Sequence, residues 1–208
     1  MCRPVPDESL GWIRTAMSRR SPNRGRITSN HRPRIRSRVI DRMSLHYTPP
    51  MRRVLTADVE FRIEQSLAQF PELTAKTIRV GLTRSADGTA EAERMTIRLN
   101  VRKRRGVSYF TIGHELTHLL QSGGLGLIPS GEVPCDIWTL ARGDLFLDDR
   151  PTYLCGSLWT RHNWPCYSRT VRDLCVQAIE LRRTNRRYLV WLSGALKQVV
   201  TAPVLPRT

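Results

Sequence analysis

Two histidines and a glutamate lie close together in the segment His114-Glu115-Leu116-Thr117-His118. Residues four apart in a helix project from the same side, so a helix here would present two imidazole nitrogens to one point in space. That geometry fits two ligands of a tetrahedral Zn²⁺ ion. Glu115 would lie about 100° further round the helix, where a carboxylate can act as general base on a zinc-bound water. The segment therefore predicts hydrolysis of a peptide bond by that water.

A catalytic zinc site needs a third protein ligand, and the segment that follows offers two carboxylates. Glu132 comes fourteen residues after His118, and Asp136 comes four residues after Glu132. If residues 129–141 are helical, both carboxylates share one face of that helix. Glu132 could then bind the metal, while Asp136 accepts a hydrogen bond from the far nitrogen of a ligand histidine and fixes its tautomer.

The pattern H-E-x-x-H followed by E-x-x-x-D resembles the gluzincin clan of zinc metallopeptidases, most closely the small minigluzincin-type peptidases and the soluble core of the CAAX-prenyl-protease type. The resemblance covers about residues 75–145. It implies the metal ligands His114, His118 and Glu132, with Glu115 as the base and Asp136 bracing a histidine. It also implies that the strand before the active-site helix, residues 95–101, pairs with an extended peptide substrate as an edge strand. The histidine that metzincins would have at position 124 or 128 is absent.

The transition state also needs a donor that faces the developing oxyanion. Tyr153 is the preferred candidate, and His162 and Tyr167 are the others; a packed or surface role is the alternative for each. Another cluster of possible ligands consists of Cys155, His162, Cys166 and Cys175. Its spacings match no familiar zinc knuckle, so free thiols are favoured over a second, structural zinc site.

Several elements are predicted around these residues. Helices are expected at residues 55–70, from a Ser108 cap to Gly123-Gly124, and at residues 129–141, 168–183 and 187–200. Residues 77–82 and 95–101 alternate apolar and polar side chains, which favours two antiparallel strands. The predicted class is α+β and zincin-like, with a small antiparallel sheet packed on the active-site helix and a helical C-terminal half.

Charge divides the chain into two predicted parts. The formal net charge is +16, and residues 1–50 hold eleven arginines against three carboxylates, which is half of that charge. We expect residues 1–50 to be a basic, disordered extension and residues 51–208 to form the peptidase domain. The extension could contact nucleic acid by releasing counterions. The basic run at residues 102–105 is weaker evidence for such contact, and a solvated turn is the favoured interpretation.

Cysteine spacing and the distribution of apolar residues indicate where in the cell the protein acts. The five cysteines form no C-x-x-C pair, and the sequence shows neither an apolar signal segment nor a run long enough to span a membrane. These features predict a cytoplasmic enzyme that acts on a peptide or protein. Two alternatives stay open, namely a zinc-binding protein without catalytic activity and a nucleic-acid-associated protein that uses its basic arm.

Overall fold

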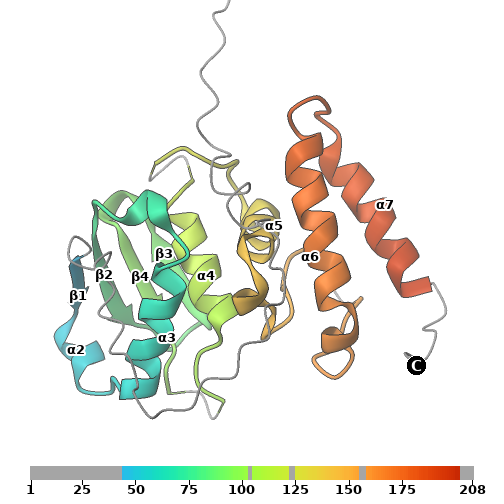
Figure 1. Ribbon diagram of the computed structural model, residues 1–208. Helices are drawn as coiled ribbons and strands as arrows, with labels where there is room; N and C mark the ends of the chain where they lie inside the picture. Colours follow the sequence, from blue (N-terminus) through green and yellow to red (C-terminus); the bar gives the residue numbers. More distant parts are fainter. Residues whose placement is uncertain (1–43, 103–104, 122–124, 155–157, 202–208) are drawn as a thin grey trace, which may run out of the picture. The chain divides into compact units, whose positions relative to one another are not determined.

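A four-stranded mixed β-sheet and a series of helices make up this protein in a computed structural model that describes residues 44–102, 105–121, 125–154 and 158–201 (Figure 1). The strands are β1 (Ser44–Tyr47), β2 (Thr77–Leu82), β3 (Gly88–Glu91) and β4 (Thr96–Leu99). The α-helices are α2 (Pro49–Arg52), α3 (Ala57–Leu67), α4 (Tyr109–His118), α5 (Glu132–Arg142), α6 (Trp164–Leu181) and α7 (Tyr188–Thr201). The predicted α+β class is confirmed at this level.

The sheet has the strand order β1-β2-β4-β3, and only β3 runs against its neighbour. Val80 of β2 pairs with Ile97 of β4 in parallel register, and Ala90 of β3 pairs with Ile97 from the other side in antiparallel register. The prediction that β2 and β4 are antiparallel was therefore wrong. Alternation of apolar residues reports which side chains share a face, but it does not report strand direction. After β2 the chain reverses direction to form β3 and reverses again to form β4, so β4 runs parallel to β2.

β4 lies between β2 and β3, so it cannot serve as the predicted edge strand beside the active-site helix. That position belongs to β3, a four-residue strand with the sequence Gly-Thr-Ala-Glu. Such a short, weakly apolar segment carries little strand signal, which explains why the sequence pattern missed it. One side of β3 remains unpaired within the sheet and borders α4.

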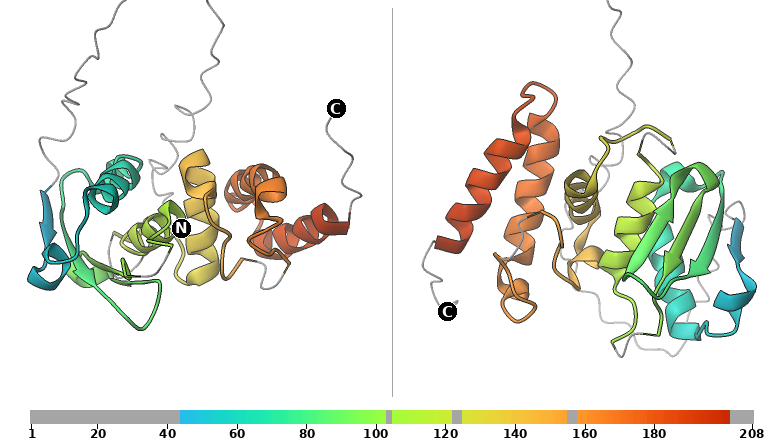
Figure 2. Two further views of the ribbon diagram at one scale, coloured as in Figure 1. Left: turned by 90° about the horizontal axis from the view of Figure 1, so that it is seen from below. Right: turned by 180° about the vertical axis from the view of Figure 1, so that it is seen from behind.

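The helices extend away from the sheet as successive layers (Figure 1 and Figure 2). α4 packs on β3 and β4, α3 and α5 pack on α4, α6 packs on α5, and α7 packs on α6. The predicted apolar stripe of α4 is confirmed, because its side chains are at most 1% exposed. These side chains are Ile112, Leu116, Leu119 and Leu120. Each predicted helix is present with shifted ends.

The folded part of the chain begins before the predicted boundary at Met51. Ser44–Tyr47 pair with β2 as strand β1, and Met51 in α2 is fully buried. Backbone pairing and core packing thus include at least residues 44–50, which the sequence had placed in the basic extension. Residues 1–43 lie outside the described part, so the predicted state of that segment stays a prediction. Among the described residues, no helix has the length and apolar character needed to cross a bilayer.

Candidate metal centre

The N-terminus of α4 is held by two side chains that accept backbone hydrogen bonds. Ser108 Oγ accepts from the Thr111 amide at 3.0 Å, as expected for a helix cap. Asp148 accepts from the Tyr109 and Phe110 amides at 2.8 and 2.9 Å. The first four backbone amides of a helix have no acceptor within the helix itself. These contacts fix the start of the helix that carries both histidines.

α4 ends at His118, earlier than the Gly123-Gly124 end that the sequence predicted. Its last turn tightens, with the Leu119 and Leu120 amides donating to the carbonyls of Leu116 and Thr117. The predicted length of about four turns was therefore too great. Residues 122–124 lie outside the described part of the chain.

A glycine lets α4 approach its neighbours closely. A Cβ atom on Gly113 would stand 2.6 Å from the Phe146 ring and 2.9 Å from Thr139 Cγ2, which is closer than packed atoms allow. One turn further along, the hydroxyls of Thr117 and Thr139 lie 2.9 Å apart across the buried contact between α4 and α5. This close contact sets the position of α5, and hence of Glu132 and Asp136, relative to the two histidines.

Three polar atoms converge beside the end of α4. His114 Nε2 and His118 Nε2 lie 3.2 Å apart, and Glu132 Oε2 lies 3.0 Å from the first and 3.2 Å from the second. Ligands at 2.0–2.1 Å from a tetrahedral zinc ion are separated by about 3.3 Å. These three residues are therefore spaced as the protein ligands of such an ion would be. The spacing fits a metal ion held by these residues.

The orientation of each imidazole is set by an acceptor at its other nitrogen. Asp136 Oδ2 accepts from the amides of Tyr153 and Leu154 at 2.6 and 2.8 Å. Its Oδ1 lies 2.9 Å from His114 Nδ1 in an ion-pair contact, and it accepts no hydrogen bond among the described residues. Asp136 is fully buried, so its carboxylate depends on these contacts. The nearby carboxylate favours a proton on His114 Nδ1, and in the neutral ring this leaves Nε2 as an acceptor.

Gln121 does the same for His118, and sequence reasoning missed it. Gln121 Nε2 donates to the carbonyls of Pro129 and Gly131 at 2.7 and 2.8 Å, so the amide oxygen must face the other way. That oxygen lies 2.8 Å from His118 Nδ1, which consequently donates. His118 Nε2 is then also a bare acceptor. The available sequence signal was only a glutamine three residues after the motif, whereas its role depends on the loop at residues 129–131.

When both rings are neutral with their protons on Nδ1, these contacts leave three acceptors facing one another. Two imidazole lone pairs and a carboxylate oxygen at 3.0–3.2 Å repel each other unless a cation lies among them. Burial lowers the pKa of His114, but the surrounding carboxylates, with Asp136 foremost, outweigh it and raise that pKa overall. The electrostatics of the cluster thus favour positive charge.

Glu115 lies beside this cluster and packs against the edge strand. It is only 6% exposed, and burial raises its pKa to about 7, partly opposed by His114. A Cβ atom on Gly88 of β3 would stand 2.5 Å from Glu115 Oε1, so a glycine is required there. A base whose pKa lies near neutrality is well matched to proton transfer at that pH. Gly88 is a second residue whose role at the site was missed by sequence reasoning.

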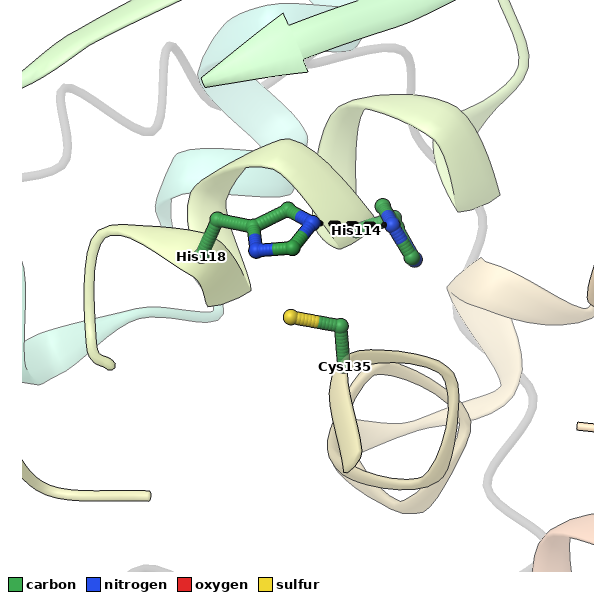
Figure 3. A group of neighbouring side chains, drawn as sticks. All are labelled: His114, His118 and Cys135. Carbon is green, nitrogen blue, oxygen red and sulfur yellow. Dashed lines mark hydrogen bonds between the residues drawn. The ribbon is translucent and has the colours of Figure 1, made fainter. Parts of the chain in front are cut away.

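Cys135 also approaches the two histidines. The ligand atoms of His114, His118 and Cys135 all lie within 4.8 Å of one another, and Figure 3 shows the thiol of α5 facing both rings. Burial, and then the nearby carboxylates, raise the pKa of this thiol. A thiol must lose its proton to bind a metal. The spacing of His114, His118 and Cys135 could hold a metal ion, whereas the raised pKa disfavours the thiolate that binding requires. Glu132 Oε2 also contacts both ring nitrogens.

The cluster opens into a cleft of about 560 Å³. Its walls come from β3 and the preceding loop, from α4 and Glu132, and from Asp149, Arg150, Thr152, Tyr153 and Arg161. Tyr153 lines this cleft, with its ring stacked on that of His114 at a centroid distance of 5.8 Å. His162 and Tyr167 do not line it. Two arginines that sequence reasoning did not consider, Arg150 and Arg161, do.

The sequence-predicted residues thus fall into two groups. Five of the predicted residues line one cleft, namely His114, Glu115, His118, Glu132 and Tyr153, and the buried Asp136 contacts His114 behind it. The other proposed cluster is not assembled among the described residues: Cys166 is exposed and Cys175 is buried, while Cys155 lies outside them. Lys103 and Arg104 of the basic run also lie outside the described residues.

Comparison with known proteins adds no assignment. No protein-family model, no curated protein and no solved structure matches this chain. The candidate function therefore depends on the geometry and chemistry of the cleft.

Proposed function

We propose that this protein is a zinc-dependent metallopeptidase of the gluzincin type, in which His114, His118 and Glu132 bind the metal and Glu115 acts as the general base. One observation carries the proposal: His114 Nε2, His118 Nε2 and Glu132 Oε2 converge on one point, 3.0–3.2 Å from one another. Two nitrogens and one oxygen are a usual ligand set for catalytic zinc, with a fourth position left open.

Glu132 is the proposed third ligand rather than Cys135. Its Oε2 is already at the ligand-to-ligand spacing of a tetrahedral ion from both rings. Its side chain is 46% exposed, so the open side of the centre faces the solvent from which water and substrate enter. Cys135, by contrast, is fully buried.

The proposed reaction is hydrolysis of a peptide bond by water. A bound zinc ion would supply Lewis acidity that lowers the pKa of a water at its open position toward neutrality. Glu115 takes the proton of the attacking water and passes it to the leaving amine. Asp136 and Gln121 hold the two rings in place during this transfer. Tyr153 is the preferred donor to the developing oxyanion.

The surroundings of the centre suit an extended chain. β3 borders the cleft with Gly88, Thr89 and Ala90, and its outer edge is unpaired within the sheet. A peptide can pair with such an edge through main-chain hydrogen bonds. A second cavity of about 590 Å³ shares Asp87, Thr111, Asp149 and Arg161 with the cleft, which gives room for residues on one side of the cleaved bond.

The test is Glu115→Gln, which preserves shape and removes the base. We expect zinc content and thermal stability to match those of the unaltered protein, while cleavage of a quenched fluorescent peptide library falls by about 10²–10⁴-fold. Glu93→Gln, the same change at an exposed glutamate, is the control and should leave cleavage unchanged. Cleavage by Glu115→Gln at the rate of the control would exclude this mechanism. A zinc-loaded protein without cleavage in either form would indicate the non-catalytic alternative.

A further inference from the structure

The turn between α6 and α7 combines exposed apolar side chains with a cluster of arginines. We call residues 182–191 the hairpin tip. Leu189, Val190 and Trp191 are 38%, 70% and 37% exposed, and they are three of the six large apolar side chains that are exposed in the described part of the chain. Consecutive exposure of this kind marks a contact surface more often than a scattered apolar residue does.

Four exposed arginines come shortly before these side chains in the sequence: Arg182, Arg183, Arg186 and Arg187. Between residues 180 and 201 the only carboxylate is Glu180. The hairpin tip is therefore strongly cationic as well as apolar.

The backbone holds the hairpin tip in one conformation. The amides of Thr184 and Asn185 donate to the Leu181 carbonyl at 3.1 and 2.9 Å, and Asn185 Oδ1 accepts from the Arg187 amide at 2.8 Å. Tyr188 and Leu192, by contrast, are buried. The turn stands at the far end of the α6–α7 hairpin and projects past α5 in Figure 1 and in the right view of Figure 2. Its apolar and charged groups are thus presented together.

We propose that the hairpin tip docks on an anionic lipid surface. Arginine guanidinium groups bind headgroup phosphates, tryptophan favours the interface, and leucine and valine favour the adjoining hydrocarbon. An anionic lipid surface thus offers a favourable contact to both the arginines and the apolar side chains of the hairpin tip. A second copy of the chain fits less well, because two facing tips would oppose eight arginines. Nucleic acid would satisfy the arginines but would leave Leu189 and Val190 without a complementary contact.

The test uses the full chain and two kinds of vesicle, pure phosphatidylcholine and phosphatidylcholine with about one third phosphatidylserine. We expect cosedimentation with the anionic vesicles. The double variant Arg186→Glu/Arg187→Glu and the single variant Val190→Asp should each weaken it by at least about tenfold. The matched control is Arg52→Glu/Arg53→Glu, which makes the same charge change at two exposed arginines outside the tip and should retain binding within about threefold.

Three results would overturn the proposal. One is an unaltered protein that does not bind the anionic vesicles. The next is an equal loss in both double variants, which would assign binding to net charge, including that of residues 1–50. The last is light scattering that shows a dimer of the unaltered protein and a monomer of Val190→Asp, which would make a second copy the occupant. Circular dichroism of each variant confirms that a loss does not reflect unfolding.

Discussion

The α4–α5 contact and the hairpin tip differ in which side chains they bury: the first buries polar groups, and the second exposes apolar ones. At the first, polar groups are buried among partners: Asp136 is fully buried, and its Oδ2 accepts two amide hydrogen bonds. At the second, Val190 is 70% exposed beside a cluster of arginines. Burying polar groups with partners fixes a geometry, whereas exposing apolar groups leaves a surface to be covered. The comparison separates a region built to hold atoms in place from one built to meet something outside the chain.

The largest expected effect comes from shortening one apolar side chain in each region. Leu140 in α5 is fully buried, so Leu140→Ala leaves a cavity and should reduce the free energy of unfolding by about 2–5 kcal/mol. Val190→Ala should change it by no more than about 0.5 kcal/mol, because the side chain is mostly in solvent. Urea denaturation of both variants measures this. Similar losses at the two positions would show that the hairpin tip is covered in the native protein.

Closer to the cleft, Gly88→Ala should act on turnover rather than on metal binding. The added Cβ would stand 2.5 Å from Glu115 Oε1, so the base must move. A displacement of about 1 Å costs about 100-fold in rate, and peptide cleavage should fall by that amount while zinc content stays the same. Gly81→Ala is the control, because its Cβ would meet only the flexible Arg98 side chain, at 3.1 Å. An equal loss of turnover in the two variants would contradict a role for Gly88 in positioning Glu115.

A smaller effect is expected at the supports of the two rings. Asp136→Asn removes the charged acceptor at His114 Nδ1 and should weaken zinc binding by about 10–100-fold. Gln121→Ala removes the neutral acceptor at His118 and should weaken it less. Competition with a fluorescent zinc chelator measures both affinities. Asp58→Asn, at a carboxylate that is 69% exposed, serves as the control. Zinc affinity unchanged in Asp136→Asn would show that the bracing contact does not matter.

The candidate site could be predicted from sequence largely because helical geometry is local. The spacing of His114 and His118, and of Glu132 and Asp136, fixes which side chains share a helix face. The helix of Glu132 starts three residues later than predicted, yet the pair still lies on it. Once the two helices pack against each other, the pair on α4 and the pair on α5 come together without any further contact having to be predicted.

What the sequence did not predict depends on contacts between distant segments. Gln121 supports His118 only because a loop eight to ten residues later supplies carbonyls for its amide. Gly88 matters only because β3 runs beside α4, and the direction of β4 is set by that same short strand. Neither feature has a local signature. Strand β1 was missed because it is short, half exposed and adjacent to a basic segment.

The metal centre itself is tested most directly by the zinc content of three proteins purified in parallel: the unaltered chain, Glu132→Ala and Cys135→Ser. We expect about one zinc ion per chain in the unaltered protein and in Cys135→Ser, and a large loss in Glu132→Ala, because Glu132 Oε2 lies 3.0 and 3.2 Å from the two ring nitrogens. Full zinc in Glu132→Ala, or its loss in Cys135→Ser, would contradict the proposed ligand set.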